Sequence, residues 1–380
     1  MAITLDTHTV AHLLGRLLPA GDAQLADWHL APIAVVPGQL TGGLYRLSGT
    51  ARYHDAPIQW SLVLKIVSAP PDAPPLFTEP DQPLYWKREV LAYQSGVLDT
   101  LPGGLHAPRC IDVAEQPDGS YHLWLEDVAD TYGPVWPLAQ YSIAARTLGR
   151  FNGAYLAGQA IPAYPWFVTD GIASQRGAID HAPWLRDLIA DSRTWQHPLL
   201  NSTFPSMIAE RLLRLWDTRD ALFDALARMP RTLCHLDAWQ GNLFFAPGGD
   251  GRERLIAIDW AVIGKAAPGV DPGDLLASYF LFRVEPTDPQ TLDTTIFTGY
   301  LDGLREAGWQ GDPRQVRLTY AAFTALKYAL RPYWLADVLD ECKHKMWERH
   351  SRHSMPQFLH NAAIFLTYLL DLADEARALL

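Results

Sequence analysis

Residues 234–245 of the chain read CHLDAWQGNLFF. Three polar side chains, His235, Asp237 and Asn242, lie among apolar residues that are typical of a buried strand. A polar group costs free energy when it is buried without a hydrogen-bond partner. These side chains therefore either form hydrogen bonds with one another in a core or carry out chemistry. Their spacing, H-x-D-x-x-x-x-N, helps to decide between these two alternatives.

A second carboxylate follows in the run LIAIDW over residues 255–260, which contains Asp259. We predict a β-hairpin with strands at residues 242–245 and 255–258, which would bring Asn242 and Asp259 together. Their oxygen atoms suit a magnesium ion that is bound through few protein groups plus phosphates. Asp237 could accept a proton from a hydroxyl. This division of roles is the one used in kinase-type phosphoryl transfer.

The first third of the sequence supplies a matching pair of charges. Lys65 is the only charged residue in QWSLVLKIV, a predicted strand over residues 59–67, and Glu89 lies on the next predicted helix, residues 84–98. An ammonium group in an apolar strand is costly without a partner. We therefore predict a Lys65–Glu89 ion pair that faces nucleotide phosphates.

Gly42 and Gly43 lie between the first two strands that the pattern predicts, one ending near residue 36 and one over residues 44–47. Glycine lets backbone N–H groups approach phosphates closely, although a simple hairpin turn would also use it. The surrounding stretch, residues 38–43, does not have the G-x-G-x-x-G pattern of protein kinases.

Together these residues resemble the aminoglycoside phosphotransferase and choline kinase-like family, a branch of the protein-kinase-like fold. The matching residues run from about Gly38 to Ala277. The resemblance implies that Asp237 is catalytic, that His235 shapes the catalytic loop, and that Asn242 and Asp259 bind the metal. It also implies that the run DLLA from Asp274 is the start of the following helix.

In the first third, the resemblance implies that Lys65 and Glu89 form the family's ion pair. It further implies that LWLEDV over residues 123–128 is an inter-lobe hinge, where backbone groups from Glu126 to Val128 bind the adenine edge. The expected cofactors are accordingly ATP and Mg²⁺.

The order of the predicted elements indicates the fold class. Strands are grouped in the first third and helices in the remainder, which favours α+β over a parallel α/β sheet. We expect a bilobal protein-kinase-like fold with a small β-rich N-lobe and a larger, mainly helical C-lobe. The N-lobe, residues 1–128, would bind nucleotide, and the C-lobe, residues 129–380, would carry catalysis and substrate binding.

The activity implied is transfer of the ATP γ-phosphoryl group to a hydroxyl of a small molecule, aminoglycoside-, amino-sugar- or choline-like. Two alternatives stay open: a protein kinase, and a non-catalytic kinase-like protein that binds nucleotide. Only 15 residues separate Asp259 from Asp274. That spacing leaves no room for a long activation loop and favours a small-molecule acceptor.

The net charge indicates which classes of partner the protein favours, and the cysteine content indicates its cellular setting. The formal net charge of −11 argues against nucleic acid or an anionic membrane as a main partner and is compatible with a cationic substrate. The three cysteines, Cys110, Cys234 and Cys342, are far apart, which favours a reducing, cytoplasmic setting. No apolar run has the length of a membrane span. The first residues favour an amphipathic helix capped by Asp6 or Thr7.

Two further groups have both a structural and a functional interpretation. Trp239 lies between Asp237 and Asn242, and Trp260 directly follows Asp259. For both we favour core packing over a substrate platform. The acidic residues Asp337, Asp340 and Glu341 could face a cationic substrate, but their helical spacing favours a solvated face.

Overall fold

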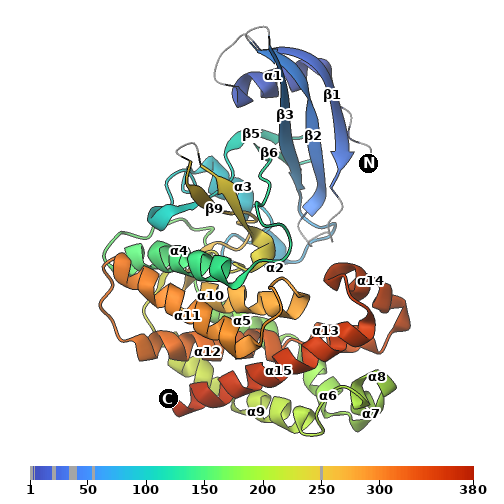
Figure 1. Cartoon of the computed structure of the whole chain (residues 1–380), viewed down its shortest axis with the longest axis vertical. Coiled ribbons are helices and arrows are strands. Elements are labelled where there is room, and N and C mark those ends of the chain that lie inside the picture. The colour runs from blue at the N-terminus through green and yellow to red at the C-terminus, as the bar shows by residue number, and fades with distance from the viewer. Residues whose placement is uncertain (1–2, 4, 19–22, 34–40, 54–55, 249–250) are drawn as a thin grey trace. The chain divides into compact units, whose positions relative to one another are not determined.

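The computed structural model describes residues 3, 5–18, 23–33, 41–53, 56–248 and 251–380. The chain forms two compact units, the first made of residues 1–100 and 106–129 and the second of residues 101–105 and 130–380. The first unit is built on a β-sheet and the second is mainly helical, so the predicted α+β class is confirmed (Figure 1). The division of functional roles between residues 1–128 and 129–380 stays a prediction.

The first unit contains a five-stranded sheet in the order β1-β2-β3-β6-β5, in which every neighbouring pair is antiparallel. Its elements are α1 (Thr7–Leu17), β1 (Gln24–Pro32), β2 (Thr41–Tyr53), β3 (Ala56–Val67), α2 (Pro75–Thr78), α3 (Arg88–Gln94), β5 (Cys110–Glu115) and β6 (Tyr121–Glu126). The short strand β4 (Leu105–His106) spans the boundary between the units.

Helix α1 covers one face of this sheet. The Asp6 carboxylate accepts a hydrogen bond from the Thr9 N–H at 2.7 Å, which confirms the first of the two predicted caps. Alternate residues of β3 point to the helix, because side chains on a strand alternate between its two faces. The resulting core contains Val10, Leu13, Leu14, Leu47, Ala51, Trp60, Leu62, Leu64, Ile111 and Trp124.

The second unit is mainly helical and also contains a small β-hairpin. The hairpin pairs β8 (Leu243–Pro247) with β9 (Glu253–Ala257) in antiparallel register, as predicted. The remaining elements are η1 (Pro102–Gly104), α4 (Leu138–Leu156), α5 (Gly171–Asp180), α6 (Pro183–Ala190), α7 (Ser192–Gln196), α8 (Pro198–Asn201), α9 (Ile208–Ala227), β7 (Thr232–Cys234), η2 (Gln240–Asn242), β10 (Gly264–Ala266), α10 (Val270–Leu276), η3 (Ala277–Leu281), α11 (Pro289–Glu306), α12 (Pro313–Ala329), α13 (Tyr333–Val338), α14 (Glu341–Ser351) and α15 (Met355–Ala378).

Several elements differ from the sequence-based expectation. The helix predicted over residues 84–98 is only α3, because Pro83 precedes it and Gly96 adopts a left-handed φ of 73° just after it. The helix predicted over residues 312–339 is split into α12 and α13 around Pro332. Strand β1 was not predicted at all. Of the strand predicted at residues 33–36, only Ile33 lies within the described residues.

No helix in the ranges given above is long and apolar enough to cross a membrane.

Helices α4 and α11 lie side by side, and glycines make their close approach possible (Figure 1). A Cβ atom on Gly149 would lie 2.2 Å from the Tyr300 carbonyl oxygen, and one on Gly303 would lie 2.0 Å from the Arg146 carbonyl oxygen. Both distances are far below van der Waals contact, and both obstacles are backbone atoms that cannot rotate away. The two helices can keep this separation only if these positions lack a side chain.

We therefore expect Gly303→Ala to lower the free energy of unfolding by about 1–3 kcal/mol, because the added methyl group forces the two helices apart. Urea denaturation followed by circular dichroism measures this change. Gly177→Ala is the matched control, since a Cβ there meets nothing within 4 Å. It should raise stability by about 0.5–1 kcal/mol through helix propensity. Equal shifts in the two variants would contradict the packing argument.

Candidate functional site

A buried carboxylate holds the loop that contains Asp237. Asp271, on α10, has no exposed surface. Its oxygens accept hydrogen bonds from the backbone N–H groups of His235 at 3.1 Å and Leu236 at 2.9 Å. Hydrogen bonds to an ionised acceptor are stronger than those between neutral groups. Asp271 thus sets the path of the backbone directly before Asp237.

Two neighbouring helices support Asp271. The Asn152 side-chain amide, on α4, donates to Asp271 at 3.1 Å and to the Leu233 carbonyl oxygen at 2.8 Å. The hydroxyl of Tyr300, on α11, donates to the Asn152 Oδ1 atom at 2.8 Å. These residues are buried and bonded to one another, so the loop rests on a connected polar network within an apolar core.

His235 connects the loop to the second strand of the hairpin. Its ring is buried, and Nε2 lies 2.9 Å from the Ile258 carbonyl oxygen. That contact requires a proton on Nε2, which leaves Nδ1 to accept the Asp237 N–H at 3.3 Å. The ring also packs on Trp260, with 4.5 Å between centroids. His235 therefore braces the loop with both ring nitrogens occupied, an arrangement that suits a structural role.

The structure brings Asp237, Asn242 and Asp259 together as the hairpin predicted. The Asn242 side-chain amide donates to the Asp237 Oδ2 atom at 2.8 Å and to its carbonyl oxygen at 3.0 Å. The Ile258 N–H donates to the Asn242 carbonyl oxygen at 2.9 Å, which places Asp259 next along the chain. Asp259 has a φ of 61°, a left-handed conformation that aspartate and asparagine adopt more readily than most residues with a side chain.

The electrostatics of Asp237 reflect its surroundings. Burial raises the pKa of its carboxyl group, and the negative charge of Asp259 raises it further. The Lys327 ammonium, His235 and the Asn242 amide all oppose that rise. A carboxyl group in such a setting binds a proton more readily than an exposed aspartate does.

The oxygen donors of the hairpin fit a hard divalent cation. Asn242 offers an amide oxygen and Asp259 a carboxylate, the donor types that magnesium prefers. Within the described residues, no three His, Cys, Asp or Glu side chains converge as in an all-protein metal site. A magnesium ion held here would therefore depend on phosphate oxygens or water for most of its ligands.

The predicted ion pair is present in the first unit. The Lys65 Nζ atom, on β3, lies 2.6 Å from the Glu89 Oε2 atom, on α3. The side chains are 12% and 2% exposed, so the pair is largely withdrawn from water. A pair this buried restricts the direction of the Lys65 ammonium group.

The other first-unit candidates are placed, but their roles stay predictions. Gly42 and Gly43 lie at the start of β2, beside an irregularity in its pairing with β3, rather than in a tight turn. The residues from 34 to 40 lie outside the described part of the chain. Glu126 ends β6, and its N–H donates to the Arg109 carbonyl oxygen at 2.9 Å, so this donor is already engaged. Val128 lies two residues after the end of β6.

Several important residues escaped the sequence interpretation. The run from Asp274 was expected to begin a helix, but α10 begins at Val270 and Asp271 holds the loop. Asp274 instead pairs with Lys327 of α12 at 2.6 Å. The one signal available was that Lys327 is a lone charge in AAFTALKYAL, as Lys65 is in its strand. Asn152 had no such signal.

The structure places the residues that have two interpretations, and it matches the favoured core packing for Trp260. Trp260 has no exposed surface and packs on His235, which matches the favoured core packing. The Asp337 carboxylate accepts the Trp347 indole N–H at 3.1 Å, and Asp340 caps α14. Trp239 is half-buried, and the Arg283 Cζ atom lies over its ring, 5.9 Å from the ring centroid.

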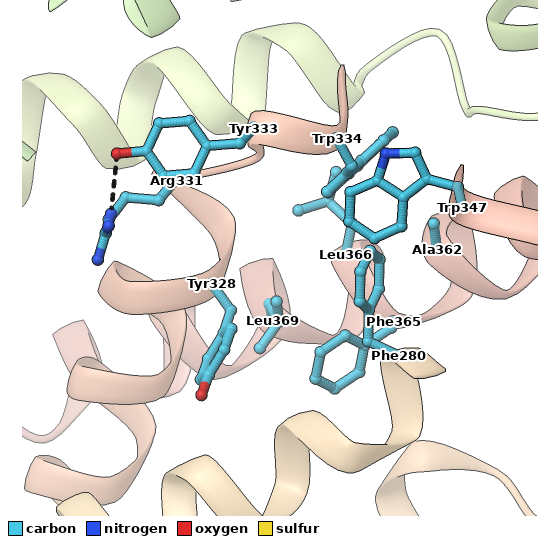
Figure 2. Close-up of a pocket in the computed structure, with 10 residues that line it drawn as sticks. All are labelled: Phe280, Tyr328, Arg331, Tyr333, Trp334, Trp347, Ala362, Phe365, Leu366 and Leu369. Atoms are coloured by element: carbon cyan, nitrogen blue, oxygen red, sulfur yellow. Dashed lines mark hydrogen bonds between the residues drawn. The ribbon is translucent and has the colours of Figure 1, made fainter. Parts of the chain in front are cut away.

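The second unit also contains an apolar pocket of about 200 Å³. Figure 2 shows aromatic rings from α13, α14 and α15 gathered around it, together with Tyr328 of α12. The residues that line it are Phe280, Tyr328, Arg331, Tyr333, Trp334, Trp347, Ala362, Phe365, Leu366 and Leu369.

No protein-family model and no curated protein matches the sequence. A solved structure does match the chain over its length: the choline kinase from Cryptosporidium parvum, with 13% sequence identity, a TM-score of 0.51, and coverage of 99% of this chain and 98% of that chain. This chain has a kinase-like fold. The fold that the residue pattern predicted is thereby confirmed.

Two further structures were found alongside this kinase-like match. One is an amicoumacin kinase in complex with AMP-PNP and Ca²⁺, with 15% identity, a TM-score of 0.49 and coverage of 92% of each chain. The other is an aminoglycoside phosphotransferase from Alicyclobacillus acidocaldarius, with 12% identity, a TM-score of 0.49, and coverage of 100% of this chain and 97% of that chain.

We expect Asp271→Asn to lower the free energy of unfolding by about 1–3 kcal/mol, because one amide oxygen cannot accept all the donors that the carboxylate accepts. Urea denaturation measures the loss, and hydrogen exchange at the His235 and Leu236 amides should quicken. Asp302→Asn, at a half-exposed i,i+3 ion pair, is the control and should change stability by less than about 0.5 kcal/mol. Unchanged amide exchange in Asp271→Asn would contradict the proposed restraint on the loop.

Proposed function

We propose that this protein is a phosphotransferase that moves the γ-phosphoryl group of ATP to a hydroxyl of a small molecule and depends on Mg²⁺. The observation that carries the proposal is the assembly of Asp237, Asn242 and Asp259 at one end of the β8–β9 hairpin. A proton acceptor and two oxygen ligands in one place are what kinase-type phosphoryl transfer requires.

The step assigns one role to Asp237. The acceptor oxygen forms a new bond to the γ-phosphorus, while the bond between that phosphorus and the β–γ bridging oxygen breaks and ADP leaves with its electron pair. The proton of the acceptor hydroxyl passes to the Asp237 carboxylate. The Asn242 amide holds that carboxylate at 2.8 Å, so its direction is set before the acceptor arrives.

Asn242 and Asp259 would hold the metal, which when bound neutralises charge on the β- and γ-phosphates. The observation that favours this role is the hydrogen bond from the Ile258 N–H to the Asn242 carbonyl oxygen, at 2.9 Å, because it keeps Asp259 close to Asn242. We assign the Lys65–Glu89 pair to the nucleotide phosphates and the backbone from Glu126 to Val128 to the adenine edge. Gly42 and Gly43 are the proposed backbone contacts to phosphate.

We expect the acceptor to bind among the helices that follow Asp271. The aromatic pocket lies among these helices. Tyr328 lines it, and its hydroxyl donates a hydrogen bond to the Asp274 Oδ1 atom at 2.8 Å. The net charge of −11 favours a neutral or cationic acceptor over an anionic one. Hydroxyl-bearing antibiotics and amino alcohols such as choline are therefore the first compounds to test.

The two alternative functions are less well supported. A protein kinase would use a long exposed segment between its metal-binding aspartate and the next helix, whereas residues 260–269 are short and mostly buried and include β10. A non-catalytic nucleotide-binding protein has no need to keep Asp237, Asn242 and Asp259 in one assembly.

We expect Asp237→Ala to lower the rate of ADP formation at least about 100-fold with any acceptor that the wild type uses, because the hydroxyl proton loses its acceptor. A coupled ADP assay with choline, spectinomycin and streptomycin measures this. Binding of AMP-PNP, measured by calorimetry, should be nearly unchanged. Asp302→Ala is the control for an aspartate outside the site. Wild-type turnover in Asp237→Ala would disprove the assignment.

A second variant tests the metal site. Asparagine tolerates the left-handed backbone of residue 259, so Asp259→Asn removes charge with little change of shape. We expect magnesium to strengthen AMP-PNP binding in the wild type and to do so much less in Asp259→Asn, because one charged ligand is lost. Calorimetry with Mg²⁺ and with EDTA measures the difference. The metal role is wrong if both proteins respond equally to Mg²⁺.

A further inference from the structure

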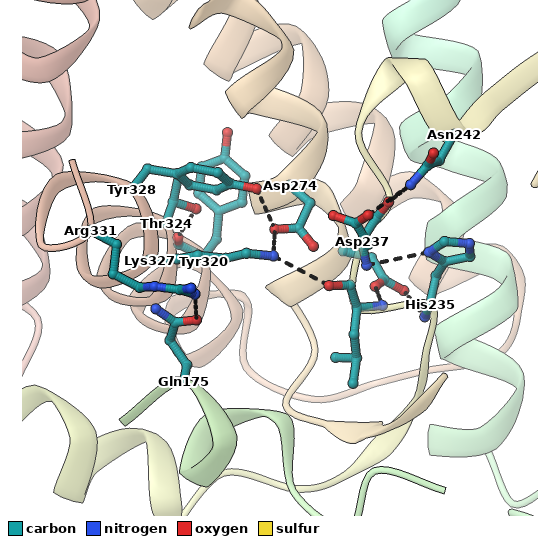
Figure 3. A network of polar contacts seen from close by, with 12 residues as sticks. Gln175, His235, Asp237, Asn242, Asp274, Tyr320, Thr324, Lys327, Tyr328 and Arg331 are labelled. Atoms are coloured by element: carbon teal, nitrogen blue, oxygen red, sulfur yellow. Dashed lines mark hydrogen bonds and ion pairs between the residues drawn. The ribbon is translucent and has the colours of Figure 1, made fainter. Parts of the chain in front are cut away.

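A lysine from a distant helix touches the catalytic loop. The Lys327 Nζ atom, on α12, donates to the Leu236 carbonyl oxygen at 3.2 Å and to the Asp274 Oδ1 atom at 2.6 Å. Figure 3 shows the Lys327 ammonium beside Asp274, with Asp237 on the neighbouring loop. Because Leu236 has a left-handed φ of 69°, the orientation of its carbonyl group depends on such tethers.

The partner of this lysine is an unusual carboxylate. Asp274 has no exposed surface, and its Oδ1 atom accepts from both Lys327 and the Tyr328 hydroxyl. Its Oδ2 atom is buried without a hydrogen-bond partner among the described residues. Burial raises the pKa of Asp274 to about 7, the nearby Asp237 raises it as well, and the Lys327 ammonium opposes that rise.

Stability alone does not explain such a pair. Burying two charges costs several kcal/mol per ion before they attract each other, and an apolar pair of similar size is often as stable. Here one carboxylate oxygen also stays unsatisfied, which adds to the cost. A function in the loop would account for its presence.

The catalytic loop itself lacks a cation. The residues between Asp237 and Asn242 are Ala-Trp-Gln-Gly, with no lysine or arginine. Phosphoryl transfer gathers negative charge on the phosphoryl oxygens, and positive groups aimed at that charge lower the barrier. Lys327 is close enough to Asp237 to act on its carboxylate electrostatically.

We propose that Lys327, held by Asp274, is a positioning residue for phosphoryl transfer: it fixes the Leu236 carbonyl and places a positive charge beside Asp237. This inference rests on the proposed function. In the transfer step the acceptor oxygen bonds to the γ-phosphorus, ADP leaves, and the proton passes to Asp237. Lys327 forms and breaks no covalent bond in this step. Its contribution is the direction of the loop and a fixed charge.

The test compares Lys327→Met, which keeps the length of the side chain but removes its charge, with Lys327→Arg, which keeps the charge. MgATP is the nucleotide, and the acceptor is whichever of choline, spectinomycin and streptomycin the wild type uses fastest, or water if it uses none. We expect Lys327→Met to lower kcat about 100- to 1,000-fold with the KM for MgATP within about twofold, and Lys327→Arg to recover part of kcat.

Arg317→Met is the matched control, because Arg317 lies on the same helix in a similarly buried ion pair with Asp293, at 2.6 Å. It is 19% exposed, against 16% for Lys327. A purely structural role would lower the thermal midpoint of both variants alike and leave kcat of the folded fraction unchanged. If Arg317→Met fails to fold, Arg211→Met, at the ion pairs with Asp371 and Asp374, replaces it.

The outcomes separate the two proposals. If the wild type forms no ADP with any of these acceptors or with water, the proposed function fails. If the wild type is active and Lys327→Met keeps its kcat within about threefold, only the role of Lys327 is overturned. An equal loss of kcat in Arg317→Met and Lys327→Met would also overturn it. A loss confined to Lys327→Met, with partial recovery in Lys327→Arg, supports it.

Discussion

The candidate site depends on one interaction, the hydrogen bonds from two backbone N–H groups to the buried carboxylate of Asp271. Backbone groups in a loop normally turn to water, and a loop free to do so would not keep a catalytic side chain in one direction. Asp271 gives the N–H groups of His235 and Leu236 a charged partner in the core. The left-handed turn at Leu236 and the direction of Asp237 follow from that restraint.

Helices α4 and α11 position the side chain that donates a hydrogen bond to Asp271. Asn152 lies one turn after Gly149 on α4, and Tyr300 lies one turn before Gly303 on α11. The absence of side chains at the two glycines lets the helices approach until the Tyr300 hydroxyl reaches Asn152. The close packing of α4 and α11 therefore fixes the position of the Asn152 side-chain amide, which donates a hydrogen bond to Asp271. Rigid packed interiors can pass on position in this way because they contain few voids.

Several carboxylates and one ammonium group lie near the loop that contains Asp237. Asp237 interacts electrostatically with Asp259 and with Asp274, and the Lys327 ammonium acts on both Asp237 and Asp274. Burial raises the pKa of both Asp237 and Asp274, and the Lys327 ammonium opposes that rise at each of them. One ammonium group thus acts on two buried carboxylates of the candidate site.

The sequence by itself determined the residue types that local spacing brings together. The β8–β9 hairpin was predictable because both strands are apolar and adjacent in the chain, so Asn242 and Asp259 had to meet. Lys65 and Glu89 were predictable because a lone charge in an apolar strand needs a partner nearby. The edge strand β1 escaped, since its mixed, half-exposed residues lack a clean alternation.

Only the tertiary structure decided which distant groups support the loop. Asp271, Asn152, Tyr300 and Lys327 come from four different helices, separated by up to 175 residues in the chain (Asn152 to Lys327), and no local pattern relates them. Their meeting depends on how closely the helices pack, which is set by side-chain volumes at positions such as Gly149 and Gly303. Periodicity reveals which face of a helix is buried, but not which neighbour that face meets.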